Sequence, residues 1–377
     1  MEAEKSIENR VLVLQGGGAL GAYQAGAYSA LHEAGYEPHW LAGISIGSIN
    51  SALIAGNPPD ERVDKLHRFW SMASTGLNAP NLFFGEYGRA MYNEMSAAEV
   101  VTFGVDGFFK PRLPAEIWKS YLPGAKGALS IYDTSALRKT LLDLVDFDRL
   151  NSNHIRVSFG AVNVRTGNFV YFDSAKIAIK PEHIMASSAL PEGFPPIEID
   201  GEWYWDGGLV SNTPLQYVID EQNDTDMCIF QVDLFPASGA LPGNLRDVVK
   251  RQKDIRFSSR TRLNTDMFRN TQEVRRVIKR LLQKYPDELR RENDYALLKK
   301  WSCNSAVTIA HLIYRQKSYE SNSKDYEFSR LSVNEHWQAG AEDVHYLLQQ
   351  KDWVDRETPT EGVKVFDYDR SSMEDLS

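Results

Sequence analysis

The stretch 11–26, VLVLQGGGALGAYQAG, passes from a run of Val and Leu through three glycines into a series of small residues. The apolar run predicts a short buried strand, and the residues after the glycines predict a helix that ends at Gly35. A second apolar run, HWLAGIS at 39–45, again leads into a helical pattern. This β-α-β-α opening predicts an α/β fold with a mainly parallel sheet and helices on its faces.

The glycines after the first predicted strand allow two interpretations. Gly16, Gly18 and Gly21 form a G-x-G-x-x-G pattern, which also occurs in dinucleotide-binding turns. Such a site needs an acidic residue at the end of the second strand to bind a ribose, whereas here the second strand runs into Ser45. We therefore expect the backbone N–H groups of Gly16, Gly17 and Gly18 to form part of an oxyanion hole instead.

The second turn carries a possible nucleophile. Residues 43–47, GISIG, form a G-x-S-x-G motif between a predicted strand and a predicted helix, the context that a nucleophile elbow requires. Gly43 and Gly47 would avoid collisions in so tight a turn, and the Ile46 N–H would point toward a developing oxyanion. The alternative is that Ser45 only caps the helix N-terminus.

A nucleophilic serine needs a base, and the candidate is Asp206 in the sequence EWYWDGG. It ends an aromatic strand, and Gly207 and Gly208 let the backbone turn sharply after it. We expect Trp203 and Trp205 to weaken the solvation of the carboxylate and so raise its pKa toward a value useful to a general base.

Histidine offers an alternative base. None of the eight histidines lies in a recognisable catalytic context, but a Ser-His-Asp triad stays open because triad partners converge in space and not in sequence. Asp200 is interpreted as a hairpin turn residue.

In this order, the glycine turn GGGALG, the elbow GISIG and the DGG with NTP behind it resemble the patatin-like phospholipase family, as does the intervening ASSALPEGFPPIEIDG. The resemblance covers residues 9–236. It implies a three-layer α/β/α fold and hydrolysis of lipid acyl esters by a Ser-Asp dyad, without metal or cofactor. Ser45 would be the nucleophile and Asp206 the base. Leu20 stands where many members carry a basic residue, so the oxyanion hole would depend on backbone N–H groups.

Domain organisation follows from the composition along the chain. The hydrolase domain is predicted over 9–236, with a loop-rich, cap-like insertion at 57–130 that forms either a small satellite core or a lid over an apolar pocket. The aromatic residues of this insertion are Phe83, Phe84, Tyr87, Tyr92, Phe103, Phe108, Phe109 and Trp118. Residues 237–366 are expected to form a helical C-terminal extension, and 367–377 a disordered tail.

Charge is unevenly distributed. The net charge of −9 argues against a nucleic-acid partner, yet residues 241–300 hold 17 Lys or Arg against 8 Asp or Glu. Within them EVRRVIKRLLQKY places apolar side chains on one helix face, at Val274, Val277, Ile278, Leu281 and Leu282. This block is predicted either to dock on an anionic membrane surface or to pack on the α/β core with its basic residues solvated.

The cellular location is predicted from the cysteines and the N-terminal sequence. Cys228 and Cys303 are far apart in the sequence, so they suggest neither a disulfide framework nor a zinc site. No secretory signal or spanning segment is recognised, so we expect a cytoplasmic protein, peripherally membrane-associated if the basic block docks.

These features predict a serine acyl hydrolase acting on fatty-acyl esters of phospholipids or lysophospholipids. One alternative is a soluble carboxylesterase or thioesterase, because the same dyad serves those substrates. Another is a catalytically silent lipid-binding protein with the same fold, against which the intact Ser45, Asp206 and glycines argue.

Overall fold

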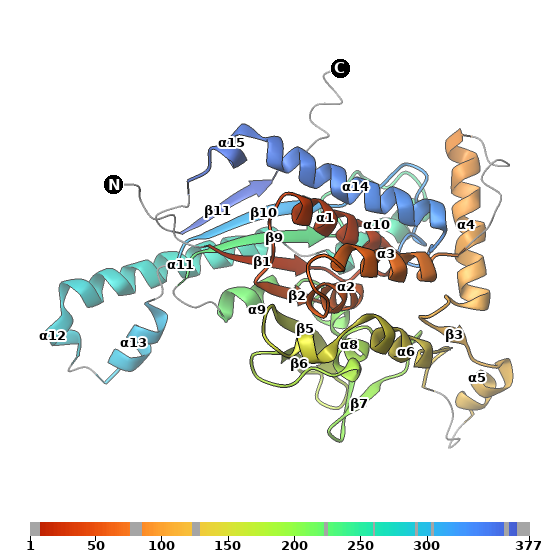
Figure 1. Ribbon diagram of the computed structural model, residues 1–377, viewed down its shortest axis with the longest axis horizontal. Coiled ribbons are helices and arrows are strands. Elements are labelled where there is room, and N and C mark those ends of the chain that lie inside the picture. Colours follow the sequence, from red (N-terminus) through yellow and green to blue (C-terminus); the bar gives the residue numbers. More distant parts are fainter. Residues whose placement is uncertain are drawn as a thin grey trace.

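A nine-stranded sheet with the order β11-β10-β9-β1-β2-β5-β8-β7, and with β6 paired to β5, forms the centre of the molecule (Figure 1). The structure, a computed structural model, describes residues 8–75, 85–122, 129–221, 225–258, 261–290, 293–302, 305–357 and 362–367. The strands are β1 (Asn9–Leu14), β2 (Trp40–Gly43), β5 (Arg156–Asn163), β6 (Phe169–Asp173), β7 (Ile197–Ile199), β8 (Glu202–Asp206), β9 (Met227–Asp233), β10 (Val307–Ile313) and β11 (Val363–Asp367). All pairs from β11 to β5 are parallel, whereas β6, β7 and β8 pair antiparallel, which confirms the predicted mainly parallel sheet.

Helices connect and cover these strands. In the first part of the chain they are α1 (Gly21–Glu33), α2 (Ile46–Ala55), α3 (Arg62–Ala73), α4 (Gly85–Phe103), α5 (Pro114–Ser120), α6 (Ser135–Leu144), α7 (Phe147–Leu150), α8 (Pro181–Ser187) and α9 (Leu215–Asp220). The later ones are α10 (Leu245–Phe257), α11 (Thr261–Lys284), α12 (Pro286–Leu289), α13 (Tyr295–Trp301), α14 (Arg330–Gln349) and α15 (Lys351–Val354). Two short 3-10 turns, η1 (Gly18–Leu20) and η3 (Gly207–Leu209), follow β1 and β8, and a small hairpin-like pair joins β3 (Lys110–Pro111) to β4 (Tyr132–Asp133).

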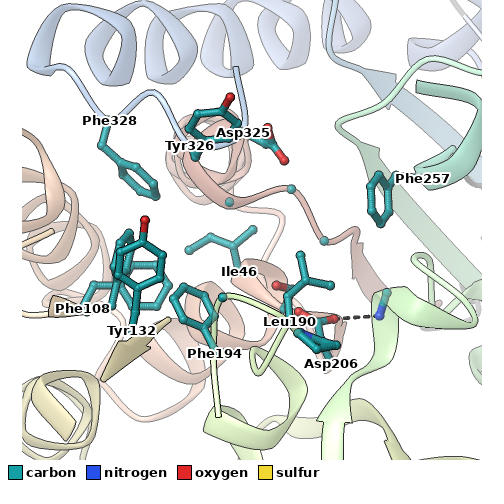
Figure 2. Close-up of a pocket in the computed structure, with 18 of the residues that line it drawn as sticks. Ile46, Phe108, Tyr132, Leu190, Phe194, Asp206, Phe257, Asp325, Tyr326 and Phe328 are labelled. Carbon is teal, nitrogen blue, oxygen red and sulfur yellow. Dashed lines mark hydrogen bonds between the residues drawn. The ribbon is translucent and has the colours of Figure 1, made fainter. Parts of the chain in front are cut away.

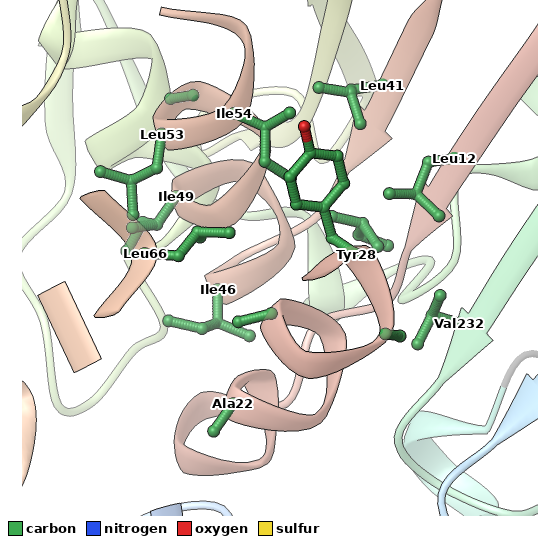
Figure 3. Close-up of a cluster of buried hydrophobic side chains, with 14 of the residues drawn as sticks. Leu12, Ala22, Tyr28, Leu41, Ile46, Ile49, Leu53, Ile54, Leu66 and Val232 are labelled. Atoms are coloured by element: carbon green, nitrogen blue, oxygen red, sulfur yellow. The ribbon is translucent and has the colours of Figure 1, made fainter. Parts of the chain in front are cut away.

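Helices cover both faces of the sheet, and successive side chains of each strand pack against one face and then the other. Leu12 and Leu14 of β1 belong to the larger apolar cluster, which includes side chains of α1, α2 and α14 (Figure 3). Val11 and Val13 of the same strand lie in a second cluster with side chains of α9. The expected α/β/α layering is therefore confirmed.

Small residues let α1 approach α14 closely. A Cβ on Gly26 of α1 would lie 1.8 Å from the carbonyl oxygen of Trp337, and one on Gly340 of α14 would lie 2.0 Å from that of Tyr23. Neither position tolerates a side chain unless the two backbones move apart. The glycines of the first helix thus allow a helix from the far end of the chain to pack against it.

The expectation that residues 237–366 are helical is wrong at two strands. β10 pairs with β9, and β11 pairs with β10, so both extend the same sheet. The VTIAHLI sequence of β10 is an apolar run rich in β-branched residues, a strand signal within an otherwise polar region. Of the predicted tail only Asp367 lies within the described residues, as the last residue of β11. The division into a hydrolase domain and an extension stays a prediction.

The predicted loop-rich insertion at 57–130 is largely helical where it is described, since it contains α3, α4 and α5. Its aromatic residues divide into two groups: Phe108 and Phe109 are buried, whereas Phe103 and Trp118 are exposed. Phe83 and Phe84 lie outside the described residues.

Two features of the remaining helices bear on membranes. Among the described residues, no helix combines the length and the apolar character needed to cross a membrane. The far end of α11, with α12 and α13, extends past the ends of the central strands where those strands begin (Figure 1). There Val274, Val277 and Leu281 are exposed, so these side chains do not pack on the α/β core.

Cys228 is buried in β9 as expected of a core cysteine, and Cys303 lies outside the described residues.

Candidate active site

A pocket of about 310 Å³ opens where β1, β2 and β8 end (Figure 2). Ligand sites of α/β sheets are commonly found at such strand ends, and this volume is at the lower limit of small-molecule pockets. Ser45, Ile46 and Asp206 are among its lining residues. Most of its wall is apolar, formed by Val100, Val101, Phe108, Phe109, Tyr132, Leu190, Pro191, Phe194, Phe235, Phe257, Tyr326 and Phe328.

The turn at Ser45 has the geometry of a strained elbow. Ser45 has φ 54° and ψ −123°, and its side chain makes no capping hydrogen bond to α2. A Cβ on Gly43 would lie 2.4 Å from the carbonyl oxygen of Gly47, and one on Gly47 would lie 2.4 Å from that of Leu14. The two flanking glycines are therefore required by close backbone contacts, and the alternative of a capping serine does not describe this geometry.

Two serines, the last residue of α8 and the one after it, form hydrogen bonds with the backbone of the elbow. The Ser45 N–H donates to the carbonyl oxygen of Ser187 at 3.1 Å, and the Ser188 hydroxyl donates to the carbonyl oxygen of Ser45 at 3.2 Å. The Ser48 hydroxyl donates to the same Ser45 carbonyl at 2.9 Å. No role was predicted for Ser187 and Ser188; the paired serines in ASSAL were the available signal, and only as part of the resemblance.

Asp206 ends β8 and is only 1% exposed. Burial raises the pKa of its carboxyl group to about 7, although the Gly208 N–H and a hydrogen bond with the Ser45 side chain act in the opposite direction. The Gly208 N–H donates to Asp206 Oδ1 at 2.7 Å, the bond dashed in Figure 2. The raised pKa and its cause, weak solvation of the carboxylate, were both expected. Because alternate residues of a strand face opposite sides, Trp203 and Trp205 lie on the other face of β8 from Asp206.

The two positions after Asp206 leave no room for a side chain. A Cβ on Gly207 would lie 2.7 Å from the carbonyl oxygen of Gly160 in β5, and one on Gly208 would lie 2.9 Å from Asn212 Oδ1. The chain can therefore turn away directly after the aspartate, which leaves the carboxylate in the pocket wall.

The expected oxyanion donors are not equivalent. The Gly16 N–H already donates to the carbonyl oxygen of Asn212 at 3.2 Å, so its predicted place among the donors is wrong. Within the described part of the chain, no hydrogen bond is found from the N–H groups of Gly17, Gly18 or Ile46, as is normal at the first turn of a helix. These three groups are therefore available to an oxygen atom in the pocket.

The glycine turn is supported by polar side chains that sequence analysis did not single out. Asn212 Nδ2 donates to the carbonyl oxygens of Gly16 and Phe257, both at 2.9 Å. Gln15 Nε2 donates to the same Phe257 carbonyl at 3.0 Å, and its Oε1 accepts the Leu234 N–H at 2.6 Å. The C-terminal end of α10 is thereby tied to the end of β1.

A segment from the last part of the chain completes the turn. The carbonyl oxygen of Asp325 accepts the Ala19 N–H at 2.8 Å, and a Cβ on Gly18, which has φ +54°, would lie 2.0 Å from that oxygen. Gly18 is thus required both by its conformation and by this contact. Lys253 of α10 forms an ion pair with the Asp325 carboxylate.

Next to Asp325 lies a buried ion pair. Lys324 Nζ donates to Asp254 Oδ1 at 2.6 Å, and both side chains are almost fully buried. Gln316 Nε2 contacts both oxygens of the same carboxylate, at 2.9 and 3.0 Å. These contacts fix the loop that carries Asp325 against α10. No sequence motif indicated them, because the partners lie about 70 residues apart.

The Ser-His-Asp alternative finds no support in this pocket. All eight histidines lie in the described part of the chain, and none of them lines it. The expected metal independence stays a prediction.

Comparison with known proteins gives two family matches. A model described as patatin-like phospholipase matches residues 12–219, and one described as patatin phospholipase matches residues 255–360. A patatin-like phospholipase domain-containing protein of Caenorhabditis elegans is 32% identical over 112 residues, which is 29% of this chain and 8% of that protein. The chain thus spans less than a tenth of the length of this curated relative.

Two solved structures are similar at low sequence identity. VipD from Legionella pneumophila is 14% identical, with a TM-score of 0.40 over 92% of this chain and 69% of that one. ExoU in its complex with SpcU from Pseudomonas aeruginosa is 15% identical, with a TM-score of 0.29 over 79% of this chain and 66% of that one. The first family match alone covers more than half of the 377 residues, and the chain belongs to the patatin-like phospholipase family.

Proposed function

We propose that the protein is a serine acyl hydrolase that cleaves fatty-acyl esters of phospholipids or lysophospholipids. One observation carries the proposal: Ser45, held at positive φ, shares an apolar pocket with Asp206, a buried carboxyl group whose pKa is raised to about 7. A base with a pKa near the working pH is suited to proton transfer from a serine hydroxyl.

In the proposed reaction Asp206 accepts the Ser45 proton as Oγ attacks the ester carbonyl carbon. The resulting oxyanion accepts hydrogen bonds from the N–H groups of Gly17, Gly18 and Ile46, which the helix dipole of α2 reinforces. Collapse of this intermediate breaks the ester bond, and the departing alcohol takes the proton from Asp206. Water then attacks the acyl-enzyme, gives a proton to Asp206 and releases the fatty acid, after which the proton returns to Ser45.

The pocket wall favours a fatty-acyl chain over a polar acyl group. Phe108, Phe194 and Phe328 lie on the side of Ile46 away from Phe257, with Tyr132 beside Phe108 (Figure 2). Among the described residues that line the pocket, the charged ones are Asp206 and Asp325, and neither Lys nor Arg is present. The pocket therefore offers no cation to a phosphate, and we place the head group outside its mouth.

The proposal is tested by measuring fatty-acid release from diacyl and lyso phospholipid vesicles, with a chelator present. Wild type should release fatty acid, whereas Ser45→Ala and Asp206→Asn should lose at least a thousandfold in rate. Asp200→Asn is the matched control, since it makes the same change at an exposed turn with φ 52° that asparagine tolerates. Full activity of the Ser45→Ala variant would contradict the proposal.

A second measurement, labelling with a fluorophosphonate probe, separates the alternatives. Labelling of Ser45 by a fluorophosphonate without lipid hydrolysis would favour the soluble carboxylesterase or thioesterase, to be assayed on short-chain esters and acyl thioesters. Absence of labelling would favour a catalytically silent lipid-binding protein.

We further propose that the exposed part of α11, with α12 and α13 (the basic arm), binds anionic lipid. Its apolar side chains are exposed, as Val277 and Leu281 illustrate, and by helix periodicity Lys279 comes from the opposite side of α11. Sedimentation with phosphatidylserine vesicles should decrease as salt rises, because the attraction is electrostatic. Binding that ignores both lipid charge and salt would contradict this role. The cytoplasmic location stays a prediction.

A further inference from the structure

Large apolar side chains are exposed at the C-terminal end of α4, on α5 and at both ends of α5. Phe103, Trp118 and Tyr121 are 73%, 70% and 75% exposed, and Leu113 is exposed as well. We call these four residues the pocket rim. Single exposed apolar residues are common on protein surfaces, but a group of this size marks an interaction site.

The pocket rim continues from the wall of the active-site pocket. Val101 of α4 lines the pocket and is also 52% exposed, two residues before Phe103. The hydroxyl of Tyr132, another pocket residue, donates to the Val101 carbonyl oxygen at 3.0 Å. Tyr132 in β4 also pairs with Pro111 in β3, which leads directly into α5. The pocket wall is therefore connected through Tyr132 and the β3–β4 pair to the segment that begins α5.

The chemistry of the pocket rim fits a lipid surface. Trp and Tyr have an apolar ring and a polar group, a combination that favours the boundary between water and hydrocarbon. The charges nearby do not select a strongly charged partner, because α4 and α5 carry both signs. Two of them are already paired, Arg89 with Glu335 and Glu94 with Arg246.

We propose that the pocket rim docks the enzyme on aggregated phospholipid, including zwitterionic lipid, so that an acyl chain passes from the aggregate into the pocket. This inference rests on the proposed function. It differs from the role of the basic arm, which lies at the opposite end of the molecule in Figure 1 and responds to lipid charge. Because the ester must reach Ser45, the surface that continues into the pocket is the one expected to contact the substrate aggregate.

The docking step is measured apart from catalysis. Ser45→Ala protein, which should leave the lipid intact, is floated with phosphatidylcholine vesicles at low salt and at 1 M NaCl. We expect flotation that is insensitive to salt, and at least a tenfold lower partition coefficient when Phe103→Ser, Trp118→Ser and Tyr121→Ser are added. Val277→Ser with Leu281→Ser, in the basic arm, is the matched control and should float as before.

Kinetics give the second readout. The same rim substitutions in the active enzyme should lower hydrolysis of phosphatidylcholine vesicles at least tenfold and leave turnover of soluble p-nitrophenyl butyrate unchanged, which also shows that the variant is folded. Trp118→Ser alone should give a smaller loss in the same direction, and Trp118→Tyr should keep most of the vesicle activity.

Three outcomes would overturn the inference: no flotation with phosphatidylcholine, flotation only with anionic vesicles at low salt, or equal flotation of the rim variant. Failure of the proposed function is distinguishable, because it would appear as no turnover of either ester by wild type, whatever the flotation result.

Discussion

Two buried carboxylates lie against the same strand, β5, in opposite electrostatic surroundings. Asp206 of β8 pairs with Ala161, and Asp173 of β6 pairs with Ser158. Each is 1% exposed. Burial by itself raises the pKa of both carboxyl groups. At Asp206 that effect prevails, whereas the pKa of Asp173 ends below its usual value.

Hydrogen-bonding partners explain the difference. Burial of Asp173 is outweighed by Arg156, whose Nη2 donates to Oδ2 at 2.6 Å, and by Tyr217, whose hydroxyl donates to the same atom at 2.7 Å. Among the described residues, Asp206 has no cation beside it and accepts a single backbone N–H, from Gly208, besides its bond with Ser45. Burial with a cation makes a structural carboxylate, and burial without one leaves a carboxyl group able to exchange a proton near neutral pH.

The largest expected effect comes from the same substitution at both positions. Asp206→Asn should lower hydrolysis about a thousandfold or more and leave the fold intact, because asparagine can still accept the Gly208 N–H. Asp173→Asn should keep the activity per folded molecule and lose about 3 kcal/mol of unfolding free energy, since it leaves Arg156 without its buried partner. Urea denaturation and kcat/KM measured on both variants test this. Equal losses of activity would remove the distinction between the two sites.

The pH dependence of catalysis sharpens the comparison. If Asp206 is the base, kcat/KM should rise with pH and level off above about 7, where the carboxylate is ionised. At pH 5 about one molecule in a hundred carries the ionised form, so activity should be about a hundredfold lower. A soluble ester substrate avoids effects of pH on vesicles. A profile that is flat from pH 5 to 8 would show that another group removes the proton.

Stability should depend on pH in opposite directions at the two sites. The folded-state pKa of Asp206 lies above its unfolded value, so the folded protein binds a proton that the unfolded chain releases between about pH 4 and 7. The cost of ionising Asp206, on the order of 4 kcal/mol, is fully present above pH 7. Asp206→Asn should therefore exceed wild type in stability most at pH 8, with the gain shrinking toward pH 4.

At Asp173 the pH dependence of stability has the opposite sign. Its folded-state pKa is lowered, so its contribution is present above the unfolded pKa and is lost as the pH falls through the folded pKa. Thermal melts of wild type and the two Asn variants between pH 4 and 8 measure both effects. A difference between wild type and Asp206→Asn that does not change with pH would contradict the assignment.

The smallest effect on the active site is expected at a third buried carboxylate, Asp254, which pairs with Lys324 near the glycine turn. Lys324→Met and Asp254→Asn should each destabilise the protein by about 3 kcal/mol, because each leaves a buried group unpaired. The double variant should lose less than the sum, and it should lower kcat more than it raises KM, since the Asp325 carbonyl then positions the Ala19 N–H less well. Additive losses in a double-mutant cycle would show that the two residues are not coupled.

Much of the site was predictable because its signals are local. Gly43, Ser45 and Gly47 occupy five consecutive residues, and the need for a tight strand-to-helix turn is expressed there directly. The same holds for Asp206 and the two glycines after it. Gly16 shows the limit of this approach, because its N–H is taken by the carbonyl of Asn212, almost two hundred residues later. β11 was missed for a related reason, since it gains its place by pairing with β10, whereas the apolar, β-branched run of β10 was a local signal that the prediction overlooked.

The sequence by itself determined the α/β class, the strained elbow and the identity of the candidate nucleophile and base, because glycines and short apolar runs restrict the backbone locally. Only the tertiary structure decided that β8 returns antiparallel beside β5 and so brings Asp206 to Ser45. It also decided that Asp325, from the last part of the chain, supports the turn at Gly18. Asp206 and Ser45, like Asp325 and Gly18, are more than a hundred positions apart, and their geometry depends on how the whole sheet pairs and packs.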